Sequence, residues 1–200
     1  MQREGKIAGL ILAAGESSRM GRDKALLTYR GRAFLEAIIQ TLRAAGLQRI
    51  AVVLGNHAEE IQRAVDLRGI QVVINSNYRQ GQTSSLQAGL RALQKDEPEA
   101  VILCLVDHPA VSVEVVKQLL ATYQASGAPV VVPTFQGQRG HPVLLGQKLF
   151  AELLNLSTDT GANIVIRKYR EATQFTDVED SAILLNVDDP EAYRRLQEMG

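Results

Sequence analysis

The stretch LAAGESSRMGRDK, residues 12–24, follows directly on the apolar run of residues 7–11 and decides the fold. A buried strand that ends in a loop of small and cationic residues is typical of a nucleotide site, because backbone N–H groups and cations hold phosphates there. The small residues 13–15, Ala-Ala-Gly, allow phosphates to approach the backbone. Arg19 can fork across two phosphate oxygens, and Lys24 adds a mobile point charge. The stretch therefore predicts a phosphate-binding loop after the first strand.

Two commoner phosphate loops do not fit this stretch. A Walker A loop has four residues between its glycines and a lysine after them, whereas five residues separate Gly15 from Gly21 and Arg22 follows. The dinucleotide fingerprint G-x-G-x-x-G does not occur after this strand. Because Glu16 and Asp23 oppose the cations, a basic surface loop without a ligand stays open as the alternative.

Composition limits the classes of function. The chain has 200 residues, 46% hydrophobic and 22% charged, which suits one globular domain over residues 1–200. Its 22 cationic and 22 acidic residues cancel, so we expect neither a nucleic acid nor a membrane as partner. The single cysteine, Cys104, excludes an internal disulfide and lies in an apolar run, which predicts a buried, inert thiol. The first apolar run is too short for a signal peptide, and we expect a cytoplasmic protein.

Apolar runs and amphipathic segments alternate along the first two thirds of the chain. Strands are predicted at residues 7–12, 50–54, 71–74, 101–106 and 130–132. Helices are predicted near residues 33–45, 58–66, 84–94 and 112–126. This alternation predicts an α/β fold with a mainly parallel sheet between two helix layers.

The pattern changes after Pro133. Residues 134–145 predict a hairpin or extended flap. Beyond it the sequence predicts short helices at 147–154 and 161–169, strands at 174–178 and 183–185, and a terminal helix from Pro190.

Three polar segments should meet at one edge of this sheet. The phosphate loop, the segment 75–77 and Asp107 each leave the carboxyl end of a predicted strand, where open parallel sheets bind ligands. A carboxylate directly after a buried strand either caps backbone or binds a cation, and both roles stay open for Asp107.

The motif L-A-A-G-x-S-x-R-M-G-x-x-K resembles the signature of the MobA-like NTP transferases, nucleotidyltransferases with a Rossmann-like, GT-A type fold. The chain matches every fixed position. The resemblance implies that Arg19 and Lys24 bind the triphosphate and act in catalysis. It also implies that the loop backbone meets the nucleotide through Leu12, Ala13, Ala14 and Gly15.

Further segments extend the resemblance. Residues 77–86 resemble the family segment that holds base and ribose, which implies nucleotide contacts for Asn77, Gly81 and Ser85. Asp107 resembles the magnesium-binding aspartate of the family, with a role in nucleotide binding and catalysis. The segment 186–191, Asn-Val-Asp-Asp-Pro-Glu, resembles the D-I-D-T-P-E-D ending of molybdenum cofactor cytidylyltransferases.

That ending implies Asp188 as the second metal ligand, with Asn186 assisting. Capping of the terminal helix by Asp188 or Asp189 is the alternative. In the same branch, R-G-H-P and D-x-G-A segments resemble residues 139–142 and 159–162, which implies that Arg139, His141 and Asp159 bind the acceptor.

Together these segments imply a Mg²⁺-dependent enzyme that transfers CMP from CTP to molybdopterin and releases pyrophosphate. Ala14, where guanylyl-transferring relatives have glycine, favours CTP. A transient contact with a molybdoenzyme is expected. The alternatives are a sugar- or alditol-phosphate nucleotidyltransferase, a GTP-using molybdenum cofactor guanylyltransferase, and a non-catalytic nucleotide-binding regulator or chaperone of a cofactor enzyme.

Overall fold

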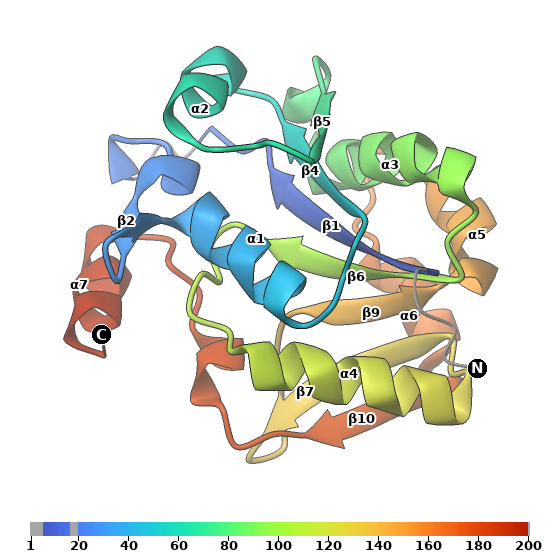
Figure 1. Ribbon diagram of the computed structural model, residues 1–200. Coiled ribbons are helices and arrows are strands. Elements are labelled where there is room, and N and C mark those ends of the chain that lie inside the picture. The colour runs from blue at the N-terminus through green and yellow to red at the C-terminus, as the bar shows by residue number, and fades with distance from the viewer. Residues whose placement is uncertain (1–5, 17–19, 200) are drawn as a thin grey trace.

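The fold is an eight-stranded sheet between two layers of helices, seen in a computed structural model that describes residues 6–16 and 20–199 (Figure 1). The strand order is β10-β7-β9-β6-β1-β4-β5, with β8 beside β7. The strand bounds are β1 Ile7–Ala13, β4 Ile50–Leu54, β5 Gln71–Ile74, β6 Ala100–Leu105, β7 Val130–Phe135, β8 Gln138–Arg139, β9 Val143–Gly146 and β10 Thr173–Asp177.

The predicted α/β class with a mainly parallel sheet is confirmed. The pairs β1 with β4, β1 with β6, β4 with β5 and β7 with β10 are parallel, while β9 is antiparallel to β6 and β7. The late hairpin is the β7–β8 pair, which turns at Gln136 and Gly137 with φ of 50° and 79°. Because β9 is buried at all four positions, the residues predicted to extend as a flap instead form a central strand of the sheet.

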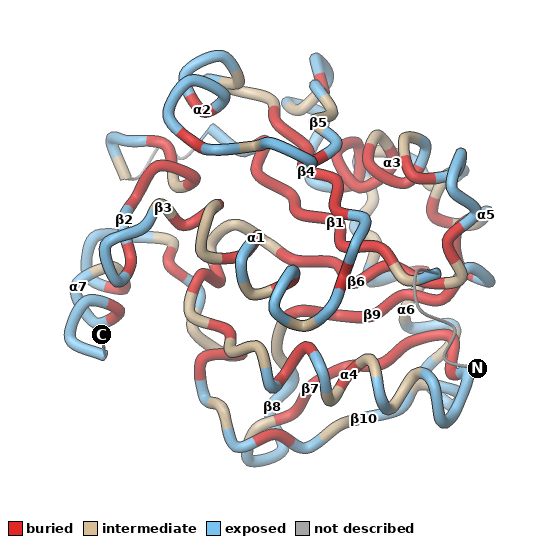
Figure 2. The backbone as a smooth tube through the Cα atoms, in the orientation of Figure 1, coloured by how far each residue is buried: buried red, intermediate tan, exposed pale blue. Residues whose placement is uncertain are grey.

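Two apolar clusters fix a helix layer on each face of the sheet. Neighbouring residues of β1 point to opposite faces, so that Ile11 joins one cluster and Leu10 the other. The helices α1 (Phe34–Ala44), α2 (Ala58–Ala64) and α4 (Val113–Ser126) pack on the first face. The helices α3 (Gln82–Leu93), α5 (Phe150–Leu154) and α6 (Asn163–Lys168) pack on the second. Figure 2 shows the buried backbone running through the central strands.

The C-terminal segment reaches back to the start of the chain. Helix α7 (Pro190–Glu198) packs against a small hairpin of β2 (Thr28–Tyr29) and β3 (Arg32–Ala33) through Leu196 and Tyr29. The ring of Tyr193 lies 5.9 Å from that of Phe34, edge to face. This packing holds Val187, whose N–H donates to the Asp107 carbonyl at 2.9 Å, beside the end of β6.

The strand predicted at residues 183–185 is wrong. Asp180 accepts a hydrogen bond from the Ala182 backbone at 2.9 Å and caps a 3-10 helix, Ser181–Leu184. A three-residue apolar run has too little length to distinguish a strand from a buried turn of helix, and the aspartate before it decides the outcome.

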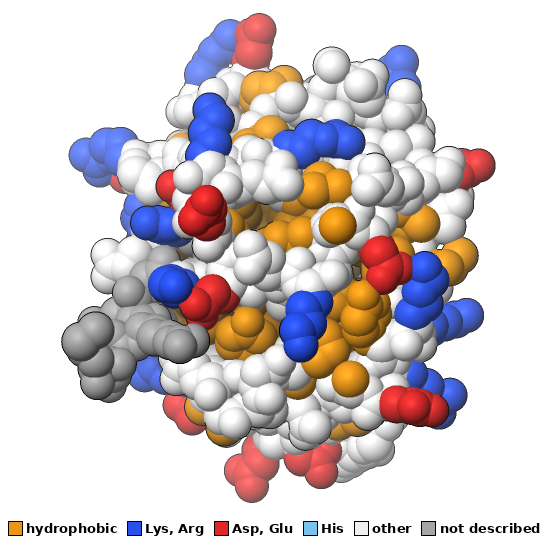
Figure 3. All heavy atoms as spheres, turned by 90° about the vertical axis from the view of Figure 1, so that its right-hand side faces the viewer, with side chains coloured by type: hydrophobic (Ala, Val, Ile, Leu, Met, Phe, Trp, Pro, Cys, Tyr) orange, Lys and Arg blue, Asp and Glu red, His pale blue; other side chains and the backbone are white. Residues whose placement is uncertain are grey.

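The surface agrees with the balanced charge. On the face drawn in Figure 3, Lys and Arg side chains are interspersed with Asp and Glu side chains around short hydrophobic areas. Among the helices that the structure describes, not one has the length and apolar character needed to cross a membrane.

Gly89 offers a test of the second cluster. A Cβ at this position in α3 would stand 2.3 Å from Leu10 Cδ1 and 3.0 Å from Val53 Cγ2. We expect Gly89→Val to lower the free energy of unfolding by about 1–3 kcal/mol through overpacking. Arg91→Val, at an exposed position of the same helix, is the control. Thermal and urea unfolding measure both, and equal stability of the two variants would contradict this packing.

Candidate active site

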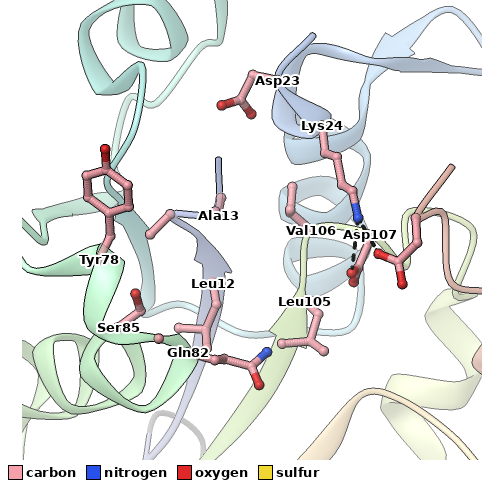
Figure 4. Close-up of a pocket in the computed structure, with 14 residues that line it drawn as sticks. Leu12, Ala13, Asp23, Lys24, Tyr78, Gln82, Ser85, Leu105, Val106 and Asp107 are labelled. Atoms are coloured by element: carbon pink, nitrogen blue, oxygen red, sulfur yellow. Dashed lines mark hydrogen bonds and ion pairs between the residues drawn. The ribbon is translucent and has the colours of Figure 1, made fainter. Parts of the chain in front are cut away.

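A cleft of about 500 Å³ opens at the carboxyl ends of β1 and β6 (Figure 4). Residues 12–15 of the phosphate loop and Asp107 line it, as expected, whereas none of residues 75–77 does and the next residue, Tyr78, lines it instead. Its lining comprises Leu12, Ala13, Ala14, Gly15, Asp23, Lys24, Tyr78, Gly81, Gln82, Ser85, Leu105, Val106, Asp107 and Asp188. Tyr78, Gln82 and Ser85 stand on one side of the cleft, and Lys24 and Asp107 stand on the other.

The small-residue loop is held by close backbone contacts. A Cβ on Gly55, directly after β4, would lie 2.7 Å from the Ala14 carbonyl oxygen and 2.7 Å from Tyr78 Cβ. The missing side chain thus lets the loop and the tyrosine approach each other. Arg19, predicted to bind phosphate, lies outside the described residues, and its role stays a prediction.

Asn75 organises the opposite wall. Its buried amide donates to the hydroxyls of Ser84 at 2.9 Å and Ser85 at 3.0 Å, and its oxygen accepts from the Asn77 backbone at 3.0 Å. Gly81, with φ of 102°, begins α3 in a conformation that favours glycine. The Asn75 side chain therefore fixes the N-terminus of α3 at the cleft.

Sequence analysis missed two residues of this wall. Tyr78 and Gln82 line the cleft, whereas Asn77 is exposed and lies outside the lining. Both belong to the segment 77–86 that pointed to the nucleotide, and an aromatic residue in a polar turn was an available signal.

Lys24 lies between two carboxylates. A 3-10 helix, Lys24–Leu26, presents it, and Asp23 caps this helix by accepting from the Ala25 backbone at 2.9 Å. The Lys24 ammonium lies 2.5 Å from Asp188 Oδ1 and 3.6 Å from Asp107 Oδ2. Burial raises the pKa of the Asp107 carboxyl above its ordinary value, and the charge of Lys24 opposes that rise.

Backbone contacts bring the two aspartates together. The Val187 N–H donates to the Asp107 carbonyl at 2.9 Å, and the Asn186 amide donates to Asp188 Oδ2 at 2.7 Å. The helix-cap role falls to Asp189, which accepts from the Ala192 backbone at 2.8 Å. Asp188 is thus available to the cleft.

The two carboxylates suit a divalent cation. Asp107 Oδ1 is buried and has no hydrogen-bond partner among the described residues, which is costly for a carboxylate oxygen unless a cation binds it. Oxygen ligands of this kind are the ones Mg²⁺ takes, with water and substrate phosphates completing the shell. The described residues include no group of three or more His, Cys, Asp and Glu arranged to hold a metal, so the protein would contribute a minority of the ligands.

The three residues predicted at the acceptor are not brought together. The Arg139 guanidinium stacks 4.8 Å from the centre of the exposed Phe175 ring. Asp159 accepts from the Thr160 hydroxyl at 3.2 Å on an exposed turn. His141 packs against His108, with ring centres 5.0 Å apart. None of the three lines the cleft, and their role in acceptor binding stays a prediction.

With this geometry in place, comparison with known proteins identifies the family. The model of the MobA-like NTP transferase domain matches residues 9–173. The chain belongs to this family. It is therefore a nucleotidyltransferase by family, as the resemblance implied.

Individual relatives cover most of the chain. Nicotine blue oxidoreductase of Paenarthrobacter nicotinovorans is 31% identical over 202 residues, 95% of this chain and 96% of the relative. A probable molybdenum cofactor guanylyltransferase of Opitutus terrae is 31% identical over 105 residues, 52% of this chain and 50% of the relative.

Solved structures agree with the fold. Rv0371c of Mycobacterium tuberculosis H37Rv superposes with a TM-score of 0.87 at 29% identity, covering 98% of this chain and all of the other. Its complex with manganese gives a TM-score of 0.80 at 29% identity, covering 97% and 98%. A relative of this MobA-like fold thus takes a divalent metal.

The two histidines beside Asp107 predict a pH dependence of stability. Burial lowers the pKa of both His108 and His141 from 6.5 to about 4. Between pH 6.5 and 4, these two imidazoles are therefore protonated in the unfolded chain but remain neutral in the folded protein. The free energy of unfolding falls as the pH drops through this range. One ring contributes about 3 kcal/mol to this fall.

Thermal unfolding of the protein and of the His108→Asn/His141→Asn variant between pH 7 and pH 4 measures this effect. We expect the melting temperature of the variant to decline less over this range than that of the native chain. Parallel declines would show that the two rings titrate normally in the folded protein.

Proposed function

We propose that this nucleotidyltransferase transfers CMP from CTP to molybdopterin, with Mg²⁺ as cofactor and release of pyrophosphate. The observation that supports it is the contact of Lys24 with Asp107 and Asp188, in a cleft that residues 12–15 also line. A cation for the phosphates and carboxylates for the metal then lie on one side of the nucleotide.

The reaction needs positioning and charge neutralisation rather than a covalent nucleophile. An acceptor phosphate oxygen forms a bond to the α-phosphorus while the bond from that phosphorus to the pyrophosphate oxygen breaks. Asp107 and Asp188 would hold Mg²⁺, which when bound neutralises charge on the phosphates. The Lys24 ammonium, which contacts both carboxylates in this structure, would also contact the triphosphate. The contact between Lys24 and the triphosphate would stabilise the negative charge that develops on the leaving pyrophosphate.

The choice of CTP rests on Ala14 and that of molybdopterin on the resemblance of residues 139–142 and 159–162. A GTP-using guanylyltransferase is the second candidate, favoured by the Opitutus relative. The Paenarthrobacter relative is named an oxidoreductase, so an activity screen should also test a redox reaction.

A nucleotide-by-acceptor screen tests the proposal. The protein is incubated with Mg²⁺ or Mn²⁺, each of the four NTPs, and either molybdopterin or sugar and alditol phosphates, and released pyrophosphate is measured. We expect the fastest release with CTP and molybdopterin. Parallel samples with a two-electron donor and nicotine blue, the compound in the relative's name, measure oxidoreductase activity. Pyrophosphate release from no combination, or only with sugar phosphates, overturns the molybdopterin proposal.

Asp107 and Lys24 should respond oppositely to substitution. Asp107→Asn removes the charge that holds the metal, so we expect turnover to fall by roughly two to four orders of magnitude. Metal-free nucleotide binding should tighten or stay the same, because a carboxylate near the triphosphate repels it. Lys24→Ala should weaken nucleotide binding with and without metal, since its attraction to phosphate needs no metal.

Isothermal titration of CTP, with EDTA or with Mg²⁺, measures these affinities, and Asp96→Asn at an exposed position is the control. If Asp107→Asn lowers the melting temperature sharply while the folded fraction keeps its turnover, Asp107 is a structural cap and the metal site is misplaced.

A further inference from the structure

The segment 139–142, Arg-Gly-His-Pro, lies behind the carboxylates of the cleft. His141 does not line the cleft; with His108, Thr41 and Cys104 it lines a separate small pocket. Asp107 lines the cleft, whereas neither ring does. This placement points to an action of the segment through Asp107.

Gly140 and His141 are fixed to the C-terminal part of the chain. The His141 N–H donates to the Ile183 carbonyl at 3.0 Å, and the Gly140 N–H donates to the Pro133 carbonyl at 3.0 Å. A Cβ on Gly140 would stand 2.4 Å from the Ile183 carbonyl oxygen. Only a glycine allows this approach, and the residues that follow Ile183 lead directly to Asp188.

The ring pair continues this contact to Asp107. The rings of His141 and His108 lie 5.0 Å apart at 47°. His108 Nε2 lies 3.7 Å from Asp107 Oδ1, the buried oxygen that has no hydrogen-bond partner among the described residues. The Val187 N–H holds the carbonyl of the same aspartate at 2.9 Å. The segment 139–142 thus contacts His108, which lies beside Asp107, and Ile183, which precedes Asp188 by five residues.

We propose that His108 and His141 are positioning residues that set the Asp107 carboxylate, and with it the spacing to Asp188, for a divalent cation. The proposal rests on the metal-dependent transfer proposed above and assigns His141 to the support of the metal site rather than to the acceptor. His108 acts through Nε2, and His141 acts by holding the His108 ring in place. Neither ring touches nucleotide or acceptor.

Mn²⁺ binding to the full-length protein tests this directly. Electron paramagnetic resonance of free Mn²⁺ gives the Kd without turnover. We expect His108→Leu and His141→Leu to raise this Kd by about 10–100-fold, the usual effect of removing a group that orients a metal ligand. His108→Gln keeps an N–H near the position of Nε2 and should restore the Kd to within about threefold of the native value.

Three comparisons separate positioning from a structural role. CTP binding in EDTA should stay within about twofold of the native value in every folded variant, because no nucleotide contact is lost. Arg139→Ala, in the same segment but stacked on Phe175, is the matched control and should leave the Mn²⁺ Kd unchanged. Melting temperatures identify variants that fail to fold, and His108→Asn, whose shorter amide does not reach the position of Nε2, then replaces the leucine pair together with His141→Asn.

The outcomes decide between the two roles of His141. A native Mn²⁺ Kd in His141→Leu together with a raised KM for the acceptor overturns the proposal and restores the acceptor role. Failure of the native protein to bind Mn²⁺ saturably also overturns it. If the native protein releases no pyrophosphate but the variants lose Mn²⁺ binding as expected, the proposed transfer fails and the positioning role stands.

Discussion

The contact between Lys24 and the carboxylates of Asp107 and Asp188 is the constraint on which the active site depends. It joins two residues 164 positions apart, one at the end of the phosphate loop and one before the terminal helix. Lys24 and Asp107 are largely shielded from water, with 13% and 20% of their side chains exposed, so neither charge is tolerated there without the other. The fold must therefore deliver three separate segments to one point.

The sheet makes this delivery possible. Strands β1 and β6 are parallel neighbours, so the loop with Lys24 and the residue Asp107 leave the sheet at the same edge. Asp188 comes to that edge by another route, through Val187 bonded to the Asp107 backbone and α7 packed on the β2–β3 hairpin. The apolar packing of α7 on the β2–β3 hairpin thus helps to set the distance between Lys24 and Asp188.

The spacing of apolar residues and the length of each apolar run explain which parts of the fold could be predicted. Strands β1, β4, β5, β6 and β7 and helices α1 to α4 follow directly from apolar runs and helical faces, whereas the short β2–β3 hairpin was not predicted. The motif at residues 12–24 places the cleft. Strand β9 was taken for a flap because a four-residue apolar run contains no information about its partner strand, and only tertiary packing places it between β6 and β7. The turn at Ser181–Leu184 was missed for the same reason.

The site shows the same division between local pattern and tertiary placement. Gly15 and Asp107, predicted to bind through the backbone and through a charge at a strand end, both line the cleft. They could be selected from the sequence because the pattern that points to them is local. The segment 75–77 was predicted to reach the sheet edge, but the role of Asn75 could not be predicted, since it lies in three hydrogen bonds to residues further along the chain.

His141 illustrates a further limit of motifs. A motif shows that a residue type belongs at a position, but whether it faces a ligand or supports a neighbour depends on the strand that carries it. Here β9 runs antiparallel to β6, so His141, two residues before β9, comes to the end of β6, where its ring packs on that of His108. One ammonium and two carboxylates leave an excess of negative charge in front of those rings. A triphosphate alone is therefore repelled by the carboxylates, and a divalent cation bound between them makes the net electrostatic interaction attractive. In the proposed metal-dependent transfer, residues that fix where the carboxylates point would therefore control whether the nucleotide and the metal bind together.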